Sequence, residues 1–467
     1  MTENNNIGES VGALRGVSLF SGGGIGDLAL RALGVDVLVA SELLPDRASI
    51  FRSNYPNAKM IEGDIRKKKE DIIRETKKRL QGKSLDILFA TPPCQGMSKN
   101  GRGKLLQGVR RGVKPKLDER NRLAIDAVDI VIALRPKMVV FENVPEMQNA
   151  IIEHNGAVRD LLELISELLA PDYEGRWEVV EFADYGVPQR RQRLITAFML
   201  KSAMPASLKK WAVLPAQTHS QHPSIITRPW VTVDEALSGV PQLDAANHRV
   251  ASDRNIPFHR VPVLDDAKYF WVSNTPPGKG AFDNQCVNPA CGFDKNPMHG
   301  SKHNSEGINR ANRDTPLNCL NCGELLPRPW VQEGAEFRLM SGFTSAYKRM
   351  RGDLPASALT RNLSYACSDQ KLHPREHRVL SLYEAFILHT VNLCHFVWRR
   401  DDNRTLSDKT VREVIGESIP PKGLEVIFKH LITTLFERRK TAKAAWFVWE
   451  RGVVNTSVEW IKPRGRK

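Results

Sequence analysis

The sequence predicts an α/β fold with a parallel sheet, followed by a smaller, loop-rich part. The first 200 residues alternate short apolar runs with helical patterns, which is typical of a parallel sheet covered by helices. After Lys201 this alternation gives way to stretches rich in Pro, His and Asn, and periodic patterns return after His373. We therefore expect one unit at 1–200, a loop-rich unit at 201–350, and a C-terminal segment at 351–467 that returns to the first unit.

Seven apolar runs are the expected strands, namely 17–20, 37–40, 59–61, 85–90, 138–141, 179–182 and 194–199. The first helix is predicted by apolar residues spaced three and four apart from Ile25 to Leu33, and Gly34 ends it. Similar patterns predict further helices at 161–169, 378–388 and 424–436.

Composition limits the classes of function. Lys and Arg number 68 against 53 Asp and Glu, a net charge of +15, which indicates an anionic partner such as nucleic acid or an ordinary basic enzyme. A hydrophobic content of 41% excludes intrinsic disorder. No apolar run is long enough to span a membrane and no signal peptide is present, which predicts a soluble, cytoplasmic protein. Seven cysteines in such a chain favour metal binding or a reactive thiol over disulfides.

A glycine-rich turn follows the first strand, at residues 20–26. Glycines let the backbone approach a ligand closely, and the next helix offers free N–H groups at its N-terminus, although a tight structural turn is the simpler alternative. Glu42 ends the second strand, where a carboxylate can accept hydrogen bonds from ribose hydroxyls, and Asp64 follows the third strand, where it can bind an adenine amino group. Together these residues favour an adenosine-type ligand at the carboxyl edge of the sheet.

Two further strand ends carry reactive groups. Pro92 and Pro93 fix the backbone ahead of Cys94, which presents the thiol at the sheet edge. The thiol is nucleophilic only as thiolate, and the alternative is a buried structural cysteine. Glu142 ends the fifth strand, so it and Cys94 can share one cleft, where a carboxylic acid can protonate a ring nitrogen.

Several segments, in this order, resemble the motifs of the DNA (cytosine-5)-methyltransferase family. They are residues 20–26, 93–95, 142–144, 189–193, 374–384 and 416–421. A set of ordered motifs is far more specific than any single one. The resemblance implies a Rossmann-like S-adenosylmethionine methyltransferase domain and, in the loop-rich part, a target-recognition domain.

In this family a cytosine is swung out of double-stranded DNA and methylated on carbon 5. The resemblance implies that Cys94 adds to carbon 6 of the ring while Glu142 hydrogen-bonds or protonates ring nitrogen 3. Arg191 and Arg193 match the arginine motif, and we expect Arg193 to orient the cytosine oxygen and to hold Glu142. The basic segment 99–116 resembles the loop that closes on DNA.

The resemblance also implies the residues that bind S-adenosylmethionine. Glu42 binds its ribose, Asp64 and Ile65 its adenine, and Ser418 completes the site. The turn residues that line it are Phe20, Gly22, Gly23 and Gly24. This chain departs from the family at Glu417, where an asparagine is usual.

Two pairs of cysteines lie in the loop-rich part. Cys286 and Cys291 are followed by Cys319 and Cys322, a spacing that predicts a structural Zn²⁺ site, a zinc ribbon near 286–322. Four cysteines leave no open position for a water molecule, so the metal holds a loop-rich segment together. His299 and His303 lie between the pairs and are the alternative ligands.

Two alternatives to a DNA methyltransferase are an RNA (tRNA) cytosine-5 methyltransferase and a non-catalytic DNA-binding protein on the same scaffold. The long recognition region and the basic loop favour DNA, and the presence of both Cys94 and Glu142 favours an active enzyme. A stand-alone enzyme of this kind resembles the modification enzyme of a restriction-modification system. It would associate with the nucleoid through DNA, with a cognate restriction endonuclease that acts separately.

Overall fold

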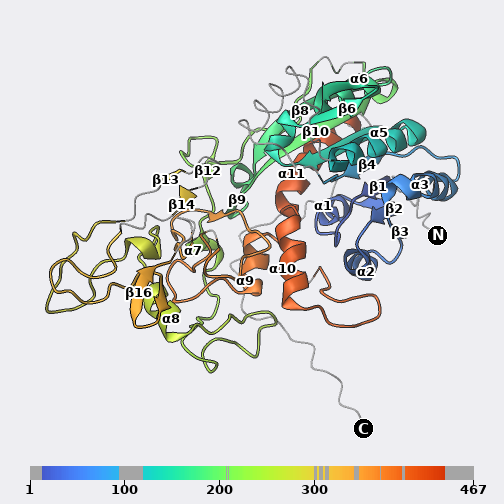
Figure 1. Ribbon diagram of the computed structural model, residues 1–467. Helices are drawn as coiled ribbons and strands as arrows, with labels where there is room; N and C mark the ends of the chain where they lie inside the picture. Colours follow the sequence, from blue (N-terminus) through green and yellow to red (C-terminus); the bar gives the residue numbers. More distant parts are fainter. Residues whose placement is uncertain are drawn as a thin grey trace, which may run out of the picture.

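The computed structural model describes residues 13–93, 119–206, 208, 210–298, 302–303, 309–310, 315–340, 346–368, 370–391 and 395–436. A seven-stranded sheet forms its centre, in the order β3-β2-β1-β4-β5-β10-β8 (Figure 1). The strands from β3 to β5 run parallel, whereas β10 is antiparallel to both β5 and β8. The bounds are β1 (Leu14–Leu19), β2 (Val35–Glu42), β3 (Lys59–Glu62), β4 (Ile87–Ala90), β5 (Met138–Asn143), β8 (Tyr173–Glu181) and β10 (Gln192–Leu200). The predicted α/β class with a mainly parallel sheet is confirmed.

Helices cover both faces of the sheet and give three layers. Because side chains alternate along a strand, Leu88 and Val139 face one helical layer while Phe89 and Val140 face the other. The first layer contains α3 (Ile65–Leu80), α5 (Leu123–Leu134) and α6 (Leu161–Leu169). The second contains α1 (Asp27–Ala32), α2 (Pro45–Asn54) and, from the far end of the chain, α11 (Pro421–Phe436).

The helix predicted at 161–169 has these bounds in the structure, whereas the one predicted at 424–436 begins three residues earlier, as α11 at Pro421. The helix expected at 378–388 is α9 (Leu382–Leu388), which begins four residues later. Ser381 is its N-cap: the Ser381 hydroxyl accepts from the Glu384 N–H, and the Glu384 carboxylate accepts from the Ser381 N–H. Such a capping box ends the extended backbone before it and fixes the first turn.

Between the sheet and α9 the chain forms what we call the loop-rich lobe, residues 241–347. Its core combines aliphatic side chains with a group of aromatic rings: the Trp271 ring packs edge-on against Trp330 at 5.6 Å and Tyr347 at 5.4 Å between ring centroids. The lobe contains α8 (Asp266–Ser273), β13 (Lys302–His303), β14 (Asn309–Arg310), β15 (Trp330–Glu333) and β16 (Glu336–Leu339). Strands β6 (Ile151–His154) and β7 (Ala157–Asp160) form a hairpin beside α6 in the sheet domain. The other elements described outside the lobe are β9 (Gln189–Arg190), β11 (His219–Ser220), β12 (Arg228–Pro229), α7 (Val233–Ala236), β17 (Ala356–Ser357) and α10 (Asp408–Glu417). Among the described helices, none has the length and apolar character that crossing a bilayer requires.

The close packing of α11 against the sheet domain depends on a glycine. A Cβ atom added at Gly423 would lie 2.1 Å from Cδ1 of Phe182, a ring with no exposed surface. We expect Gly423→Ala to lower the free energy of unfolding by about 1–3 kcal/mol, because overpacking exceeds the gain in helix propensity. Thermal denaturation tests this, with Thr433→Ala on the same helix as the control. A melting temperature equal to that of the unaltered protein would show that α11 does not pack in this way.

Candidate active site

The carboxyl ends of the parallel strands meet at one edge of the sheet, and the glycine-rich turn lies there. The carbonyl of Phe20, a residue held at φ 57°, accepts from the Thr91 hydroxyl at the end of β4 (2.9 Å). Gly22 also has a positive φ, and among the described residues other than its two chain neighbours no heavy atom lies within 4 Å of where its Cβ would stand. The turn is therefore tied to the next strand and has an open side that can receive a ligand.

Glu42 binds this turn directly. One of its carboxylate oxygens accepts from the Gly22 N–H and the other from the Leu44 N–H, both at 2.8 Å. Burial raises the pKa of Glu42, and the hydrogen bonds from the two backbone N–H groups oppose that rise. Each oxygen keeps a lone pair, so the carboxylate fits a pair of ribose hydroxyls.

Asp64 and Ile65 lie at the end of β3, where the sequence places the adenine contact. The Asp64 carboxylate caps α3 by accepting from the Arg66 N–H (3.0 Å) and also binds the Arg66 guanidinium, which lowers the pKa of Asp64. Ile65 is buried as the first residue of α3. An adenine amino group bound to Asp64 would therefore share the carboxylate with the Arg66 guanidinium. The sequence did not indicate this shared use of Asp64.

Glu142 is the buried acid of the site. It lies on β5 with 7% of its surface exposed, and its Oε1 is 2.8 Å from Nε of Arg193 on β10. Burial raises the pKa of Glu142, and the charges of Arg193 and Arg191 oppose the rise. The guanidinium of Arg193 therefore lies where the sequence predicts it, in contact with the Glu142 carboxyl group, whose orientation it fixes.

Cys94 and the basic segment 99–116 lie outside the described residues, but the backbone just before Cys94 is placed. The Pro92 carbonyl, two residues ahead of the thiol, accepts from the side-chain amide of Asn143 at 2.8 Å. Asn143 follows Glu142 directly on β5. The approach to Cys94 is thus attached to the strand that carries the buried acid.

Arg191, the other arginine of the motif, binds the C-terminal segment of the chain. Its fully buried guanidinium donates to the carbonyls of Leu359 (2.9 Å), Gly416 (3.0 Å) and Ser418 (2.7 Å). Burial lowers the pKa of Arg191 to about 9, with a further contribution from the charge of Arg193. Arg191 fastens the C-terminal segment to the sheet domain.

Ser418 follows α10, and this helix lies over the glycine-rich turn: a Cβ at Gly23 would be 2.9 Å from Cγ1 of Val414. Glu417, the position that departs from the family, is half exposed and lies 3.2 Å from the guanidinium of Arg47 on α2. Glu413 binds the same guanidinium at 3.0 Å. Two carboxylates of α10 therefore hold α2, which the sequence could not indicate because the partners lie some 370 positions apart.

The model of the C-5 cytosine-specific DNA methylase family matches residues 14–433, which is most of the chain. The chain belongs to this family. The type II methyltransferase M1.HgaI of Avibacterium volantium is 26% identical over 423 residues, covering 90% of this chain and 98% of the relative. M.AquIA of Picosynechococcus is 30% identical over 243 residues, covering 48% of this chain and 88% of the relative.

Two solved methylase structures share the fold. The Dnmt2 methyltransferase of S. pombe superposes with a TM-score of 0.52 at 12% identity, covering 91% of this chain and 99% of that one. The methyltransferase EhMeth of Entamoeba histolytica superposes with a TM-score of 0.51 at 12% identity, covering 91% of this chain and 100% of that one. The predicted family and activity are confirmed: this DNA cytosine-5 methylase uses S-adenosylmethionine as methyl donor and DNA as substrate.

The four paired cysteines of the methylase converge in the loop-rich lobe. All four sulfur atoms lie within 4.8 Å of one another, with 3.6 Å between Cys286 and Cys322 and 3.8 Å between Cys291 and Cys319. Tetrahedral zinc with Zn–S bonds of about 2.3 Å places its sulfurs about 3.8 Å apart. The side-chain amide of Asn321 donates to the Cys291 sulfur at 3.2 Å, a contact that suits a thiolate ligand. His299 and the side chain of His303 lie outside the described residues.

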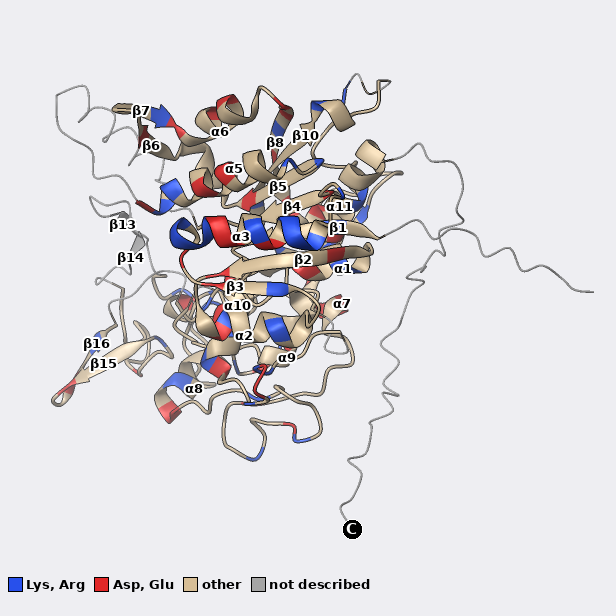
Figure 2. Cartoon of the chain, turned by 90° about the vertical axis from the view of Figure 1, so that its right-hand side faces the viewer, with Lys and Arg blue, Asp and Glu red and all other residues tan. Residues whose placement is uncertain are grey.

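The helix α3 is rich in Lys and Arg, and several of these side chains are paired with nearby acids. Figure 2 shows its row of Lys and Arg beside the acids of α5. Lys69 binds Asp126 (3.3 Å) and Asp129 of α5, and Arg79 binds Glu75 (2.9 Å) one turn before it. Such pairs are typical of a solvated helix face, so the lysines and arginines of α3 do not by themselves indicate a DNA-binding surface.

A buried acid lies behind the glycine-rich turn. Asp27 is 1% exposed, and burial raises its pKa from 3.8 to about 7. Between these pH values the folded protein retains a proton that the unfolded chain has lost, so the free energy of unfolding falls as pH rises, by at most ~4 kcal/mol.

We expect Asp27→Asn to remove this dependence. The free energy of unfolding of the variant, minus that of the unaltered methylase, should rise between pH 4 and pH 8. Urea denaturation of both proteins at each pH measures this difference. Asp36→Asn, an exposed site on β2, is the control and should show no such trend. A relative stability of Asp27→Asn that is independent of pH would contradict the buried-acid interpretation.

Proposed function

We propose that the methylase acts on a cytosine flipped out of a specific duplex sequence, with Cys94 as nucleophile and Glu142 as acid. The Cys94 thiolate forms a bond to carbon 6 while Glu142 hydrogen-bonds or protonates ring nitrogen 3, so carbon 5 gains enamine character. S-adenosylmethionine supplies the methyl group that carbon 5 takes up. Loss of the carbon 5 proton and cleavage of the C6–S bond then restore the ring and the thiolate.

The observation that carries this proposal is the buried Glu142–Arg193 pair at the sheet edge where the Pro92 carbonyl is anchored. The guanidinium keeps Glu142 in one orientation, and burial favours the protonated acid that a ring nitrogen requires. A carboxylate that merely stabilised the fold would not need to stand beside the approach to Cys94. The carboxyl end of β5 is also the edge where Glu42 and the glycine-rich turn are placed.

The proposed site for S-adenosylmethionine uses Glu42 for the ribose and Asp64 with Ile65 for the adenine. Ser418 closes it from the C-terminal segment, and Phe20, Gly22, Gly23 and Gly24 line it. The open face at Gly22 and the two backbone contacts that hold Glu42 support this assignment.

We further propose that the loop-rich lobe forms a target-recognition domain held together by Zn²⁺ on Cys286, Cys291, Cys319 and Cys322. The sulfur distances and the amide contact to Cys291 support zinc. The ion supplies four fixed bonds in a part of the chain that has few helices and strands.

The relatives named as type II methyltransferases support a role as the modification enzyme of a restriction-modification system, in the cytoplasm and with a separate cognate endonuclease. The test is incubation of the purified protein with methyl-labelled S-adenosylmethionine and either duplex DNA or tRNA, followed by nucleoside analysis. We expect 5-methyldeoxycytidine from DNA alone. Label in tRNA only would favour the RNA methyltransferase, and label in neither would favour a non-catalytic DNA-binding protein.

A further inference from the structure

A chain of hydrogen bonds joins three segments that are far apart in the sequence. Gln189 Nε2 lies 3.2 Å from Nδ1 of His389, and Nε2 of His389 lies 2.9 Å from the Ser418 hydroxyl. Gln189 and His389 have no exposed surface. The chain therefore connects the arginine motif at β9, through the end of α9, to the residue that closes the proposed cofactor site.

The partners of Gln189 and Ser418 fix the direction of each hydrogen bond. The Gln189 carbonyl oxygen accepts from the Leu359 N–H at 3.0 Å, so the amide nitrogen must face the histidine and Nδ1 must accept. The proton of the neutral ring is then on Nε2, which faces the Ser418 hydroxyl, and the ring also has a hydrogen bond with the Ile419 backbone. The Ser418 hydroxyl donates in turn to the Ile415 carbonyl at 3.0 Å. One lone pair of the Ser418 oxygen is left for a ligand.

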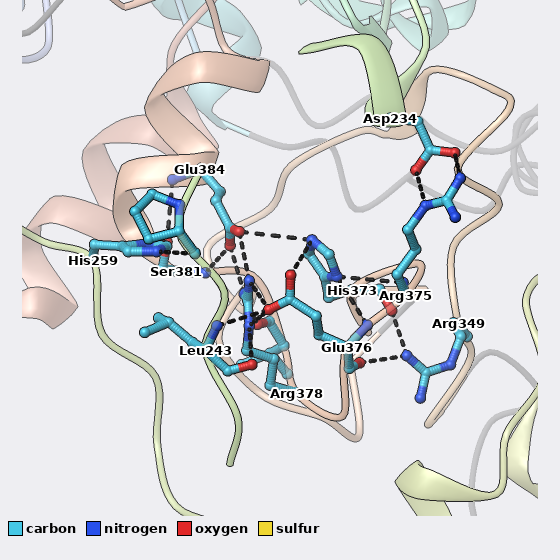
Figure 3. Close-up of polar contacts among 12 residues, drawn as sticks. Asp234, Leu243, His259, Arg349, His373, Arg375, Glu376, Arg378, Ser381 and Glu384 are labelled. Atoms are coloured by element: carbon cyan, nitrogen blue, oxygen red, sulfur yellow. Dashed lines mark hydrogen bonds and ion pairs between the residues drawn. The ribbon is translucent and has the colours of Figure 1, made fainter. Parts of the chain in front are cut away.

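His389 is placed by a rigid helix. It follows α9 directly, and its N–H donates to the Ala385 carbonyl at 2.9 Å. At the other end of α9, Glu384 forms two 2.7 Å hydrogen bonds with the buried guanidinium of Arg378 and faces His373 (Figure 3). A helix held at its first turn by a buried, doubly bonded ion pair has little freedom to shift the histidine at its end.

The surroundings keep the ring uncharged. His389 is packed near two arginines, and burial followed by the charges of Arg191 and Arg193 brings its pKa well below 6.5. A neutral ring with one donor and one acceptor suits a hydrogen-bond chain. The same cluster contains Arg191, whose guanidinium holds the Ser418 carbonyl, so backbone and side chain of Ser418 are fixed from one side.

We propose that His389 is a positioning residue for the cofactor: it holds the Ser418 hydroxyl in the orientation that binds S-adenosylmethionine, with Gln189 selecting the ring tautomer. This inference rests on the proposed cofactor site. His389 itself stays behind Ser418 and does not touch the ligand. Its loss should therefore weaken cofactor binding without removing a group from the reaction.

The test is a double-mutant cycle in the full-length protein, with the dissociation constant of S-adenosylmethionine measured by calorimetry without DNA. Loss of one hydrogen bond predicts roughly 10-fold weaker binding for His389→Leu and for Ser418→Ala. The double variant should bind no more weakly than either single one. In steady-state assays, KM for the cofactor should rise roughly 10-fold, while kcat at saturating cofactor changes less than about 3-fold.

Two further variants separate positioning from folding. His389→Gln retains an N–H donor and should recover most of the affinity, whereas His430→Leu on α11 should bind like the unaltered protein. Wild-type affinity in His389→Leu, or losses that add in the double variant, would overturn the positioning role. If the unaltered protein failed to bind S-adenosylmethionine, the proposed cofactor site itself would be wrong, and the inference with it.

Discussion

Glu142→Gln should lower the rate of cytosine methylation by about 10²- to 10⁴-fold, the range typical of a lost general acid. Glutamine preserves the shape of the side chain and can still accept from Arg193, but it cannot give a proton to ring nitrogen 3. Burial raises the pKa of Glu142, which makes the acid a better proton donor, and glutamine has no proton of this kind to give. Single-turnover methyl transfer to duplex DNA measures this rate directly.

The matched control for this experiment is Glu167→Gln. Glu167 is an exposed acid on α6 that pairs with Arg159 at 2.6 Å. It differs from Glu142 in being exposed to solvent. It should methylate at the unaltered rate, and both variants should bind S-adenosylmethionine normally. A rate for Glu142→Gln within about 3-fold of normal would remove Glu142 from the proposed acid step.

Cys319→Ser should abolish the metal content of the protein and with it specific DNA binding. Cys319 is the buried member of the four cysteines, and structural zinc contributes on the order of 10 kcal/mol to folding of small zinc domains. Elemental analysis of the unaltered protein should give one zinc per chain. S-adenosylmethionine binding should persist in the variant, because the proposed cofactor residues lie on the sheet domain.

Cys367→Ser is the control for the metal experiment, since Cys367 is an exposed cysteine outside the cluster. It should retain one zinc per chain and normal DNA binding. Two results would contradict the proposed zinc site. One is that the unaltered protein contains no zinc and still recognises DNA, and the other is that Cys319→Ser retains its full zinc content.

The sheet could be predicted from the sequence because each strand is marked by a short apolar run. Runs such as 138–141, which forms most of β5, are apolar throughout because both faces of a parallel sheet are covered. The helix α3 gave no such signal. Its buried apolar residues Ile65, Ile72 and Leu80 are separated by seven or eight positions with charged residues between them, so its apolar stripe is narrow.

The candidate site was predictable where residue type alone carries chemistry, as for Glu42 and Glu142. It was not predictable where a role depends on partners that folding brings together. Arg191 and Arg193 are two positions apart, yet one binds backbone carbonyls of the C-terminal segment and the other binds the buried acid. Likewise, nothing near His389 in the sequence indicates that its partners are Gln189 and Ser418.

The most direct measurement is the capture of the covalent intermediate. Duplex DNA with 5-fluorocytosine at the target position should stop the reaction after methyl transfer, because fluorine cannot leave as the carbon 5 proton does. With S-adenosylmethionine present, mass spectrometry of the digested complex should locate the DNA on Cys94, and Cys94→Ser should form no complex. Attachment to another residue, or methyl transfer by Cys94→Ser at the normal rate, would contradict the mechanism.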